Sequence, residues 1–308
     1  MTSAAEHRER TRAAMAAAGI DVLVLGREAN ARYVSGANRL WLAGTRPFAP
    51  SCVLVGETGA VHLLSVTDDG VPVDVRPANL YPISWNPMNL VAAAAVATAG
   101  TTVRTLGVDG MSPLFAQLLA AVYPDAELAD GEALLRDVRR TKTAGDLVAI
   151  RAAVGVAEDA LAAVAAAGPT IGAVGLAGAF VARMGQLGVT TPAFPPAIDV
   201  VEDRVSARVG VLRSGWAGVL ARTWPDDGGT RAAAAAGVAA CRPGARVSDV
   251  TAAGVTVDGL GMGHEALRAD DVLGPGMVVY VEARGDGAVW GETVVVTDDG
   301  PDALTTSP

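Results

Sequence analysis

The first half of the chain alternates helical and strand-like hydrophobic patterns. A helical pattern ends at Gly19, and the segment IDVLVLG at residues 20–26 follows it, which predicts a helix and then a buried strand. Further patterns predict, in chain order, a hairpin over residues 51–66, a helix around residues 91–99, a strand from Thr105 and a helix over residues 113–122. This alternation predicts an α/β domain.

The second half opens with a long amphipathic helix. Its apolar residues step by three and four and share one face: Leu147, Ile150, Val154, Ala157, Leu161 and Val164. Strand patterns follow, with one hairpin turning at Ser214-Gly215 and a second at residues 285–287, and an Ala-rich helical segment lies between them. We expect an α+β domain in which helices cover hairpins.

A polar stretch separates these two halves without a Gly/Ser-rich linker. We place the boundary there, with a first domain over residues 1–137 and a second over residues 138–308. A chain of 308 residues is long enough for two domains, each with its own core. Half of the residues are hydrophobic and only 4% are aromatic, so Ala, Val and Leu must supply most of both cores.

Charge and cysteine content narrow the function classes. The net charge of −9 and the absence of a continuous basic run argue against a nucleic-acid partner. No apolar run reaches the length of a membrane span, and the charged N-terminal segment does not resemble a signal peptide. With only Cys52 and Cys241, neither a disulfide framework nor a cysteine-based metal site is expected. A cytoplasmic location fits best.

Several segments, in order, resemble the pita-bread family of creatinase, aminopeptidase P, prolidase and methionine aminopeptidase. They are "GIDVLVLGREANARYVSG", "LLRDVRRTKTAGDLVAIRAAVGVAEDAL", "AFPPAI", "GWAGVLART", "CRPGARVSDV", "GMGHE", "GPGMVVYVEA" and "GETVVVTDDGPDALT". Together they span nearly the whole chain. The resemblance implies an α/β creatinase-like N-terminal domain followed by a shortened α+β pita-bread domain, and it implies a homodimer.

The resemblance also locates the metal ligands of the family's catalytic members, which bind two divalent ions through two Asp, one His and two Glu. Arg208 and Val219 stand at the Asp positions of this chain, and Asp258 stands at the His position. Only the Glu positions are kept, as Glu282 and Glu292. Because a guanidinium stays positively charged and repels a nearby cation, the departures imply a site without a metal or another cofactor.

Glu282 and Glu292 are the first candidate catalytic residues. They lie on adjacent strands of one predicted hairpin, and if they face a common interior they form an acid–base pair. The alternative is that Arg208 and Arg222 neutralise them in an ion network that only maintains the fold. A single Mn or Mg ion held by both glutamates with Asp258 and a histidine is a third, less favoured interpretation.

His264 is the third candidate catalytic residue, because an imidazole moves protons near neutral pH and the resemblance implies a substrate contact here. The alternative is a solvent-facing loop histidine. Asp258 is a candidate for binding a substrate cation or for capping a turn. Arg208 is a candidate for binding a carboxylate of the substrate, and Arg222 is a further candidate for substrate binding. Trp216 is a candidate pocket wall, as is the segment over residues 81–89, unless they belong to a core or a dimer contact.

Three functions remain open from the sequence. The first is a metal-independent, creatinase-like enzyme that uses acid–base chemistry on a small amino-acid-like or amidine-like compound. The second is a catalytically inactive pseudo-peptidase that serves as a binding scaffold. The third is an ordinary Xaa-Pro peptidase, which requires the residue correspondence given above to be wrong.

Overall fold

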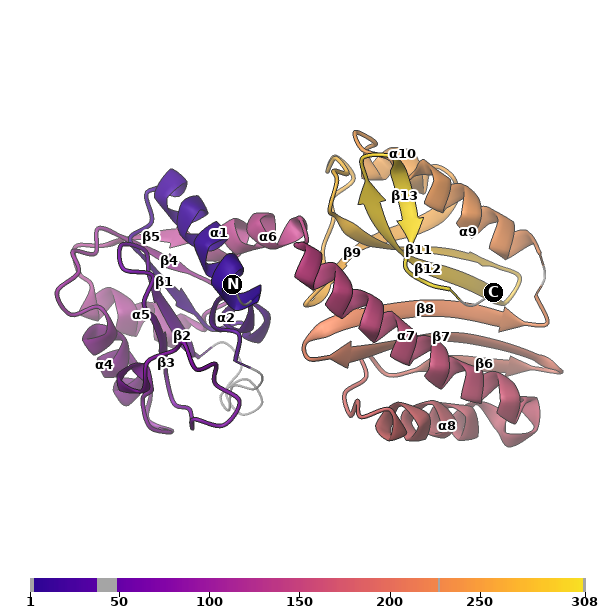
Figure 1. Cartoon of the computed structure of the whole chain (residues 1–308), viewed down its shortest axis with the longest axis horizontal. Coiled ribbons are helices and arrows are strands. Elements are labelled where there is room, and N and C mark those ends of the chain that lie inside the picture. The colour runs from indigo at the N-terminus through magenta and orange to yellow at the C-terminus, as the bar shows by residue number, and fades with distance from the viewer. Residues whose placement is uncertain (1–2, 38–48, 227, 307–308) are drawn as a thin grey trace. The chain divides into compact units, whose positions relative to one another are not determined.

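The computed structural model describes residues 3–37, 49–226 and 228–306. The chain divides between Arg139 and Arg140 into two compact units, shown in Figure 1. This division falls two residues after the boundary that we placed from the sequence.

The first unit is an α/β domain, as predicted. Its described residues form a five-stranded sheet in the order β3-β2-β1-β4-β5, in which β1, β4 and β5 run parallel and β2 and β3 form an antiparallel hairpin. The strands are β1 (Val22–Leu25), β2 (Cys52–Val55), β3 (Val61–Leu63), β4 (Thr105–Val108) and β5 (Glu127–Asp130). The helices are α1 (Ser3–Ala18), α2 (Glu28–Ser35), the 3-10 turn η1 (Pro77–Asn79), α4 (Pro87–Ala97), α5 (Pro113–Val122) and α6 (Gly131–Arg140).

The core of this unit follows from the run of four buried residues in β1. Val22 and Val24 pack against Leu90 of α4 and Leu119 of α5, so these helices cover one face of the sheet. A strand that is buried on both faces is typical of a parallel α/β sheet, and it explains why residues 22–25 are continuously apolar.

The second unit is built on a curled antiparallel sheet (Figure 1). Its described strands follow the order β10-β9-β11-β12-β8-β7-β6, with β13 paired to β12. They are β6 (Ala197–Val201), β7 (Arg204–Arg213), β8 (Trp216–Trp224), β9 (Val255–Gly261), β10 (Gly263–Glu265), β11 (Val278–Gly285), β12 (Ala288–Thr297) and β13 (Gly300–Ala303). The helices are α7 (Ala144–Ala167), the 3-10 turn η2 (Pro169–Ile171), α8 (Gly172–Gln186), α9 (Gly229–Ala240) and α10 (Val247–Thr251).

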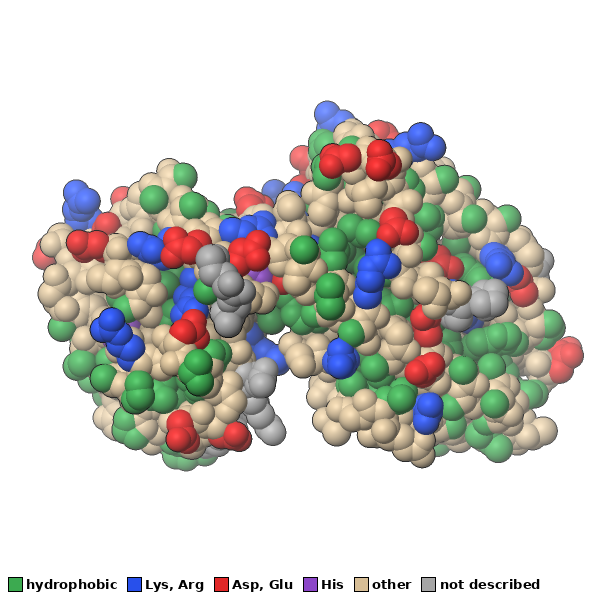
Figure 2. Space-filling view, viewed as in Figure 1, with side chains coloured by type: hydrophobic (Ala, Val, Ile, Leu, Met, Phe, Trp, Pro, Cys, Tyr) green, Lys and Arg blue, Asp and Glu red, His purple; other side chains and the backbone are tan. Residues whose placement is uncertain are grey.

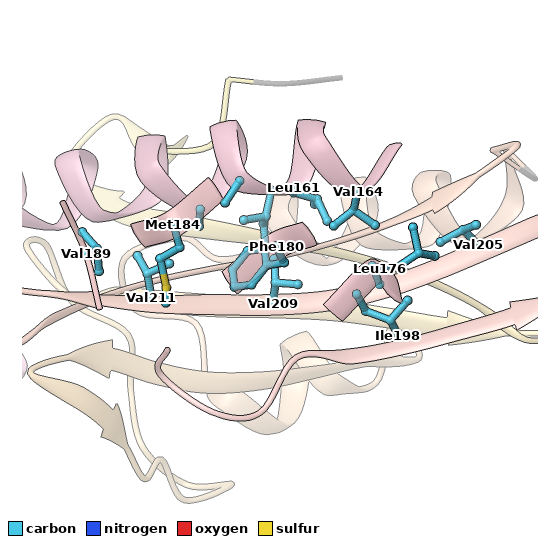
Figure 3. Packing of buried hydrophobic residues seen from close by; sticks show 14 of the residues in the cluster. Leu161, Val164, Leu176, Phe180, Met184, Val189, Ile198, Val205, Val209 and Val211 are labelled. Carbon is cyan, nitrogen blue, oxygen red and sulfur yellow. The ribbon is translucent and has the colours of Figure 1, made fainter. Parts of the chain in front are cut away.

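Helix α7 begins at a capping box, in which Thr143 and Asp146 satisfy each other's backbone N–H groups. Its predicted apolar face is buried, and Leu161 and Val164 pack with Phe180 of α8 and Val209 of β7 (Figure 3). The helix approaches β8 so closely that a Cβ at Gly218 would overlap the α7 backbone.

Helix α9 covers the other half of the same sheet face. Gly237 of α9 lies against Val255 of β9 and Val281 of β11, with room for no more than a hydrogen atom at its Cα. Helices α8 and α9 therefore pack against the same face of the strands, and the direction of each strand side chain follows from its register.

Among the described residues, no single helix is long and apolar enough to cross a membrane. The bent pair Ala144–Ala167 and Pro169–Gln186 reaches the required length and apolarity only together, across an 84° bend. On each unit, the face seen in Figure 2 carries acidic and basic side chains interspersed.

Candidate functional site

Strand register divides the candidate residues of the second unit between two faces. Residues paired directly across antiparallel strands share a face, and a step of one residue reverses it. One row of paired residues runs Thr256, Glu282, Gly291, Ala221, Arg208 from β9 to β7. We call the face that carries these side chains the Glu282 face. The adjacent positions, which include Val209, Leu220 and Val281, point to the helix-covered face.

Glu282 is the centre of a buried ion cluster on this face. Its side chain is 5% exposed, and Arg284 Nε donates to Oε1 at 2.6 Å while Tyr280 Oη donates to Oε2 at 2.6 Å. Arg208 Nε forms an ion pair with Oε2 at 3.0 Å. Burial, followed by the negative charge of Glu282, raises the pKa of Tyr280 well above its usual value, so this phenol is a hydrogen-bond donor.

Two aromatic rings fix the guanidinium of Arg208. Its Cζ lies 4.4 Å from the centroid of Phe194 and 5.5 Å from that of Tyr280. Stacking of a guanidinium on aromatic faces favours one orientation of a side chain that is otherwise flexible. Arg208 is thus held in place, in contact with Glu282.

Glu292 lies on the opposite, helix-covered face. Its register partner is Val281, and Trp290 Nε1 donates to Oε1 at 2.7 Å. Arg222 Nη2 lies 3.2 Å from the same oxygen, and the Thr305 hydroxyl donates to Oε2. The prediction that Glu282 and Glu292 face a common interior is therefore wrong, because their side chains leave opposite faces of the sheet. The two carboxylates do not form an acid–base pair.

Arg222 and Trp216 are structural residues. The side chain of Arg222 is 2% exposed; it donates to the carbonyls of Ala221 and Gly291 and stacks 4.3 Å from the Trp290 ring. Trp216 is buried in an apolar cluster with Ile150. Both side chains are buried, which agrees with the alternatives given from the sequence: a core position for Trp216 and an ion network for Arg222. Trp85, in the other predicted aromatic segment, is an exposed residue of the first unit.

Asp258 and His264 are exposed and near each other. Asp258 lies within β9 opposite Tyr280, so it belongs to the Glu282 face and does not cap a turn. His264, in β10, has Nε2 at 3.9 Å from Asp258 Oδ1, and the two side chains are 62% and 42% exposed. This pair keeps contact with solvent, unlike Glu282.

Comparisons with known proteins agree with this architecture. Residues 7–141 match the family model of the creatinase/prolidase N-terminal domain. The whole chain superposes on an Xaa-Pro dipeptidase from Bacillus anthracis with a TM-score of 0.77 and 19% identity, covering 99% of this chain and 98% of that one. The chain has the pita-bread fold.

Other solved pita-bread structures are similarly close. A prolidase from Thermococcus sibiricus superposes with a TM-score of 0.79 and 15% identity over 100% of this chain and 98% of that one. An X-Pro aminopeptidase from Thermotoga maritima superposes with a TM-score of 0.74 and 16% identity, covering 94% of this chain and 96% of that one. No curated protein matches the sequence. At these identities the structural likeness establishes the fold, and the family match covers residues 7–141. The reaction has to be argued from the site.

The residues of this pita-bread protein do not fit a two-metal centre. Of the positions assigned to metal ligands by the resemblance, Arg208 places a cation on the Glu282 face and Val219 is apolar and buried. Glu292 faces away, and the position level with Glu282 on β12 is Gly291, where any Cβ would collide with the Tyr280 hydroxyl. Within the described parts of the chain, no three His, Cys, Asp or Glu residues are grouped as metal ligands would be.

The sequence analysis did not identify three residues of the ion cluster around Glu282. Phe194 is part of the "AFPPAI" segment, and Tyr280 and Arg284 flank Glu282 at two residues on either side. The signal for Tyr280 and Arg284 was available, because residues i and i+2 of a strand share a face. Applying that rule to the strand around Glu282 would have placed a phenol and a second guanidinium beside the carboxylate.

Proposed function

We propose that this pita-bread protein is a binding protein that lacks the two-metal peptidase chemistry, a catalytically inactive relative of the Xaa-Pro peptidases. The observation that carries the proposal is the contact of Arg208 with Glu282 at 3.0 Å. A fixed positive charge on the retained carboxylate opposes a divalent ion electrostatically, and it also occupies the oxygen that such an ion would need.

The site also argues against the metal-independent reaction that we favoured from the sequence. Glu282 accepts from two donors and pairs with a third group, so it serves to hold arginines and is poorly placed to take a proton from a substrate. Its expected partner Glu292 faces the other way. Asp258 and His264 remain as an exposed pair on which proton transfer would depend. The homodimer, the small-molecule partner and the cytoplasmic location stay predictions.

Xaa-Pro dipeptide hydrolysis is the second candidate function. The observation in its favour is that the solved structures superposing on the chain include Xaa-Pro dipeptidases and prolidases along nearly its full length. It requires metal ligands other than the residues that now stand at the family positions.

Hydrolysis of Xaa-Pro dipeptides, measured with Mn²⁺ or Co²⁺ added and again with EDTA, separates these functions. The Bacillus anthracis Xaa-Pro dipeptidase serves as the positive control. We expect the purified chain to give no metal-dependent turnover. Turnover that appears with the metal and disappears with EDTA would establish the second candidate and refute the first. Turnover unaffected by EDTA and lost in His264→Ala would instead restore the metal-independent enzyme.

A further inference from the structure

The Glu282 face concentrates more positive than negative charge around one carboxylate. Arg208 and Arg284 both contact Glu282, one at each oxygen, so the three side chains together carry a net charge of +1. Two further acidic groups, Asp258 and Asp199, lie on this face, and Asp199 is diagonally across from Arg208 on β6. Asp258 is the one nearer to Glu282. It lies diagonally across from Glu282 on β9, and its recorded ionic contact is with His264. The cluster of Arg208, Arg284 and Glu282 thus has one positive charge that its own members do not balance.

The two guanidinium groups are held in position and also accessible. Arg284 donates a hydrogen bond from Nε to Glu282, which restrains its plane. Arg208 forms an ion pair with Glu282 and is fixed between Phe194 and Tyr280. The side chains of Arg208 and Arg284 are nevertheless 31% and 62% exposed, so a solute reaches them. Groups that are ordered before binding lose less conformational entropy when a ligand arrives.

We infer that Arg208 and Arg284 form a binding site for an oxyanion, a carboxylate or a phosphate group, at the positions where the family resemblance places metal chemistry. A planar guanidinium matches the two oxygens of such a group, and an anion supplies the charge that Glu282 alone does not. Glu282 is then a positioning residue that holds both arginines. This inference rests on the proposed function, because a metal at this place would exclude the arginines.

Calorimetric titration of the full chain, freed of metal with EDTA, tests the inference. Sodium phosphate and sodium succinate are titrated separately at constant ionic strength set with chloride, and the two arms distinguish a phosphate ligand from a carboxylate. We expect saturable binding of one equivalent of at least one anion. Because a hydrogen bond to a charged group is at stake, Arg208→Gln and Arg284→Gln should each weaken binding by about tenfold or more.

Arg213→Gln is the matched control, since Arg213 ends the same strand as Arg208 and lies on the opposite face. We expect it to bind like the wild type. Arg284→Gln protects the test against misfolding, because its side chain is mostly exposed. The inference is overturned if the wild type shows no saturable binding of either anion, or if both site variants bind as well as Arg213→Gln.

The same titration separates this inference from the proposed function. Anion binding that appears only with added Mn²⁺ and is reversed by EDTA would mean that a metal holds the anion. That result would refute both the oxyanion site and the proposed function. If the protein takes up no metal and binds neither anion, the oxyanion site is refuted and the proposed function is not.

Discussion

Replacing Glu282 by Gln should destabilise the second unit by about 2–4 kcal/mol. The substitution keeps the shape of the side chain and removes its charge, which leaves Arg208 and Arg284 without a counter-ion. Hydrogen bonds to charged groups contribute about 1.5–3 kcal/mol each when buried. The contact with Arg284 counts for about 0–1 kcal/mol because that side chain is 62% exposed. Most of the loss is therefore expected from Arg208 and Tyr280.

A double-mutant cycle isolates the contact between Glu282 and Arg208. We expect the double variant Glu282→Gln, Arg208→Gln to be more stable than the sum of the single losses indicates, with a coupling of about 1–2 kcal/mol. Urea unfolding followed by circular dichroism gives the free energies, and hydrogen exchange of the β11 amides assigns the change to the second unit.

Asp302→Asn provides the control for this cycle, because its ion pair with Arg151 joins two side chains that are about half exposed. It should cost less than about 1 kcal/mol. The ion cluster would be refuted by a free energy of unfolding for Glu282→Gln within about 0.5 kcal/mol of the wild type. It would also be refuted if the loss in the double variant equalled the sum of the two single losses.

Three further substitutions or modifications probe the rest of the second unit and the state of the cysteines. Gly218→Ala should destabilise the protein by about 1–3 kcal/mol, because its Cβ would overlap the α7 backbone. Gly155→Ala has open space around its Cβ and should be neutral or stabilise by up to about 1 kcal/mol. Equal effects of the two substitutions in urea unfolding would contradict the close packing at Gly218. Arg222→Gln should cost about 3–5 kcal/mol, since it breaks a largely buried ion pair, and wild-type stability would show that the pair is dispensable. Cys52 and Cys241 are both fully buried, and burial raises the pKa of both thiols, that of Cys241 to about 11. A thiol reagent at pH 8 should therefore label them only after unfolding. Stoichiometric labelling of the native chain would contradict their burial.

The sequence was sufficient for the fold because its hydrophobic periods were strong. The capped α7 helix, the hairpin at Ser214-Gly215 and the hairpin at residues 285–287 all occur where the patterns indicate them. The strand β5 was not predicted, since its residues are mostly exposed and show no apolar alternation. Its place in the sheet comes from pairing with β4, which is a tertiary effect.

The site was harder to predict than the fold, because it depends on which face each strand residue occupies. The family motifs placed Glu282 and Glu292 in one site. The strand register instead pairs Glu282 with Gly291, and because Glu292 is one residue further along β12, its side chain leaves the opposite face of the sheet. The burial of Arg222 was likewise hidden, since an arginine in a strand is usually exposed. Its partners Trp290 and Glu292 come from a strand about seventy residues further along the chain, and only the fold brings them together.

Crystals of the chain grown with excess Mn²⁺ and measured at an anomalous wavelength test the absence of a metal centre most directly. We predict that Arg208 remains in contact with Glu282 and that no anomalous peak lies within coordination distance of that carboxylate. Two peaks bridged by Glu282, with the Arg208 side chain displaced, would contradict this prediction.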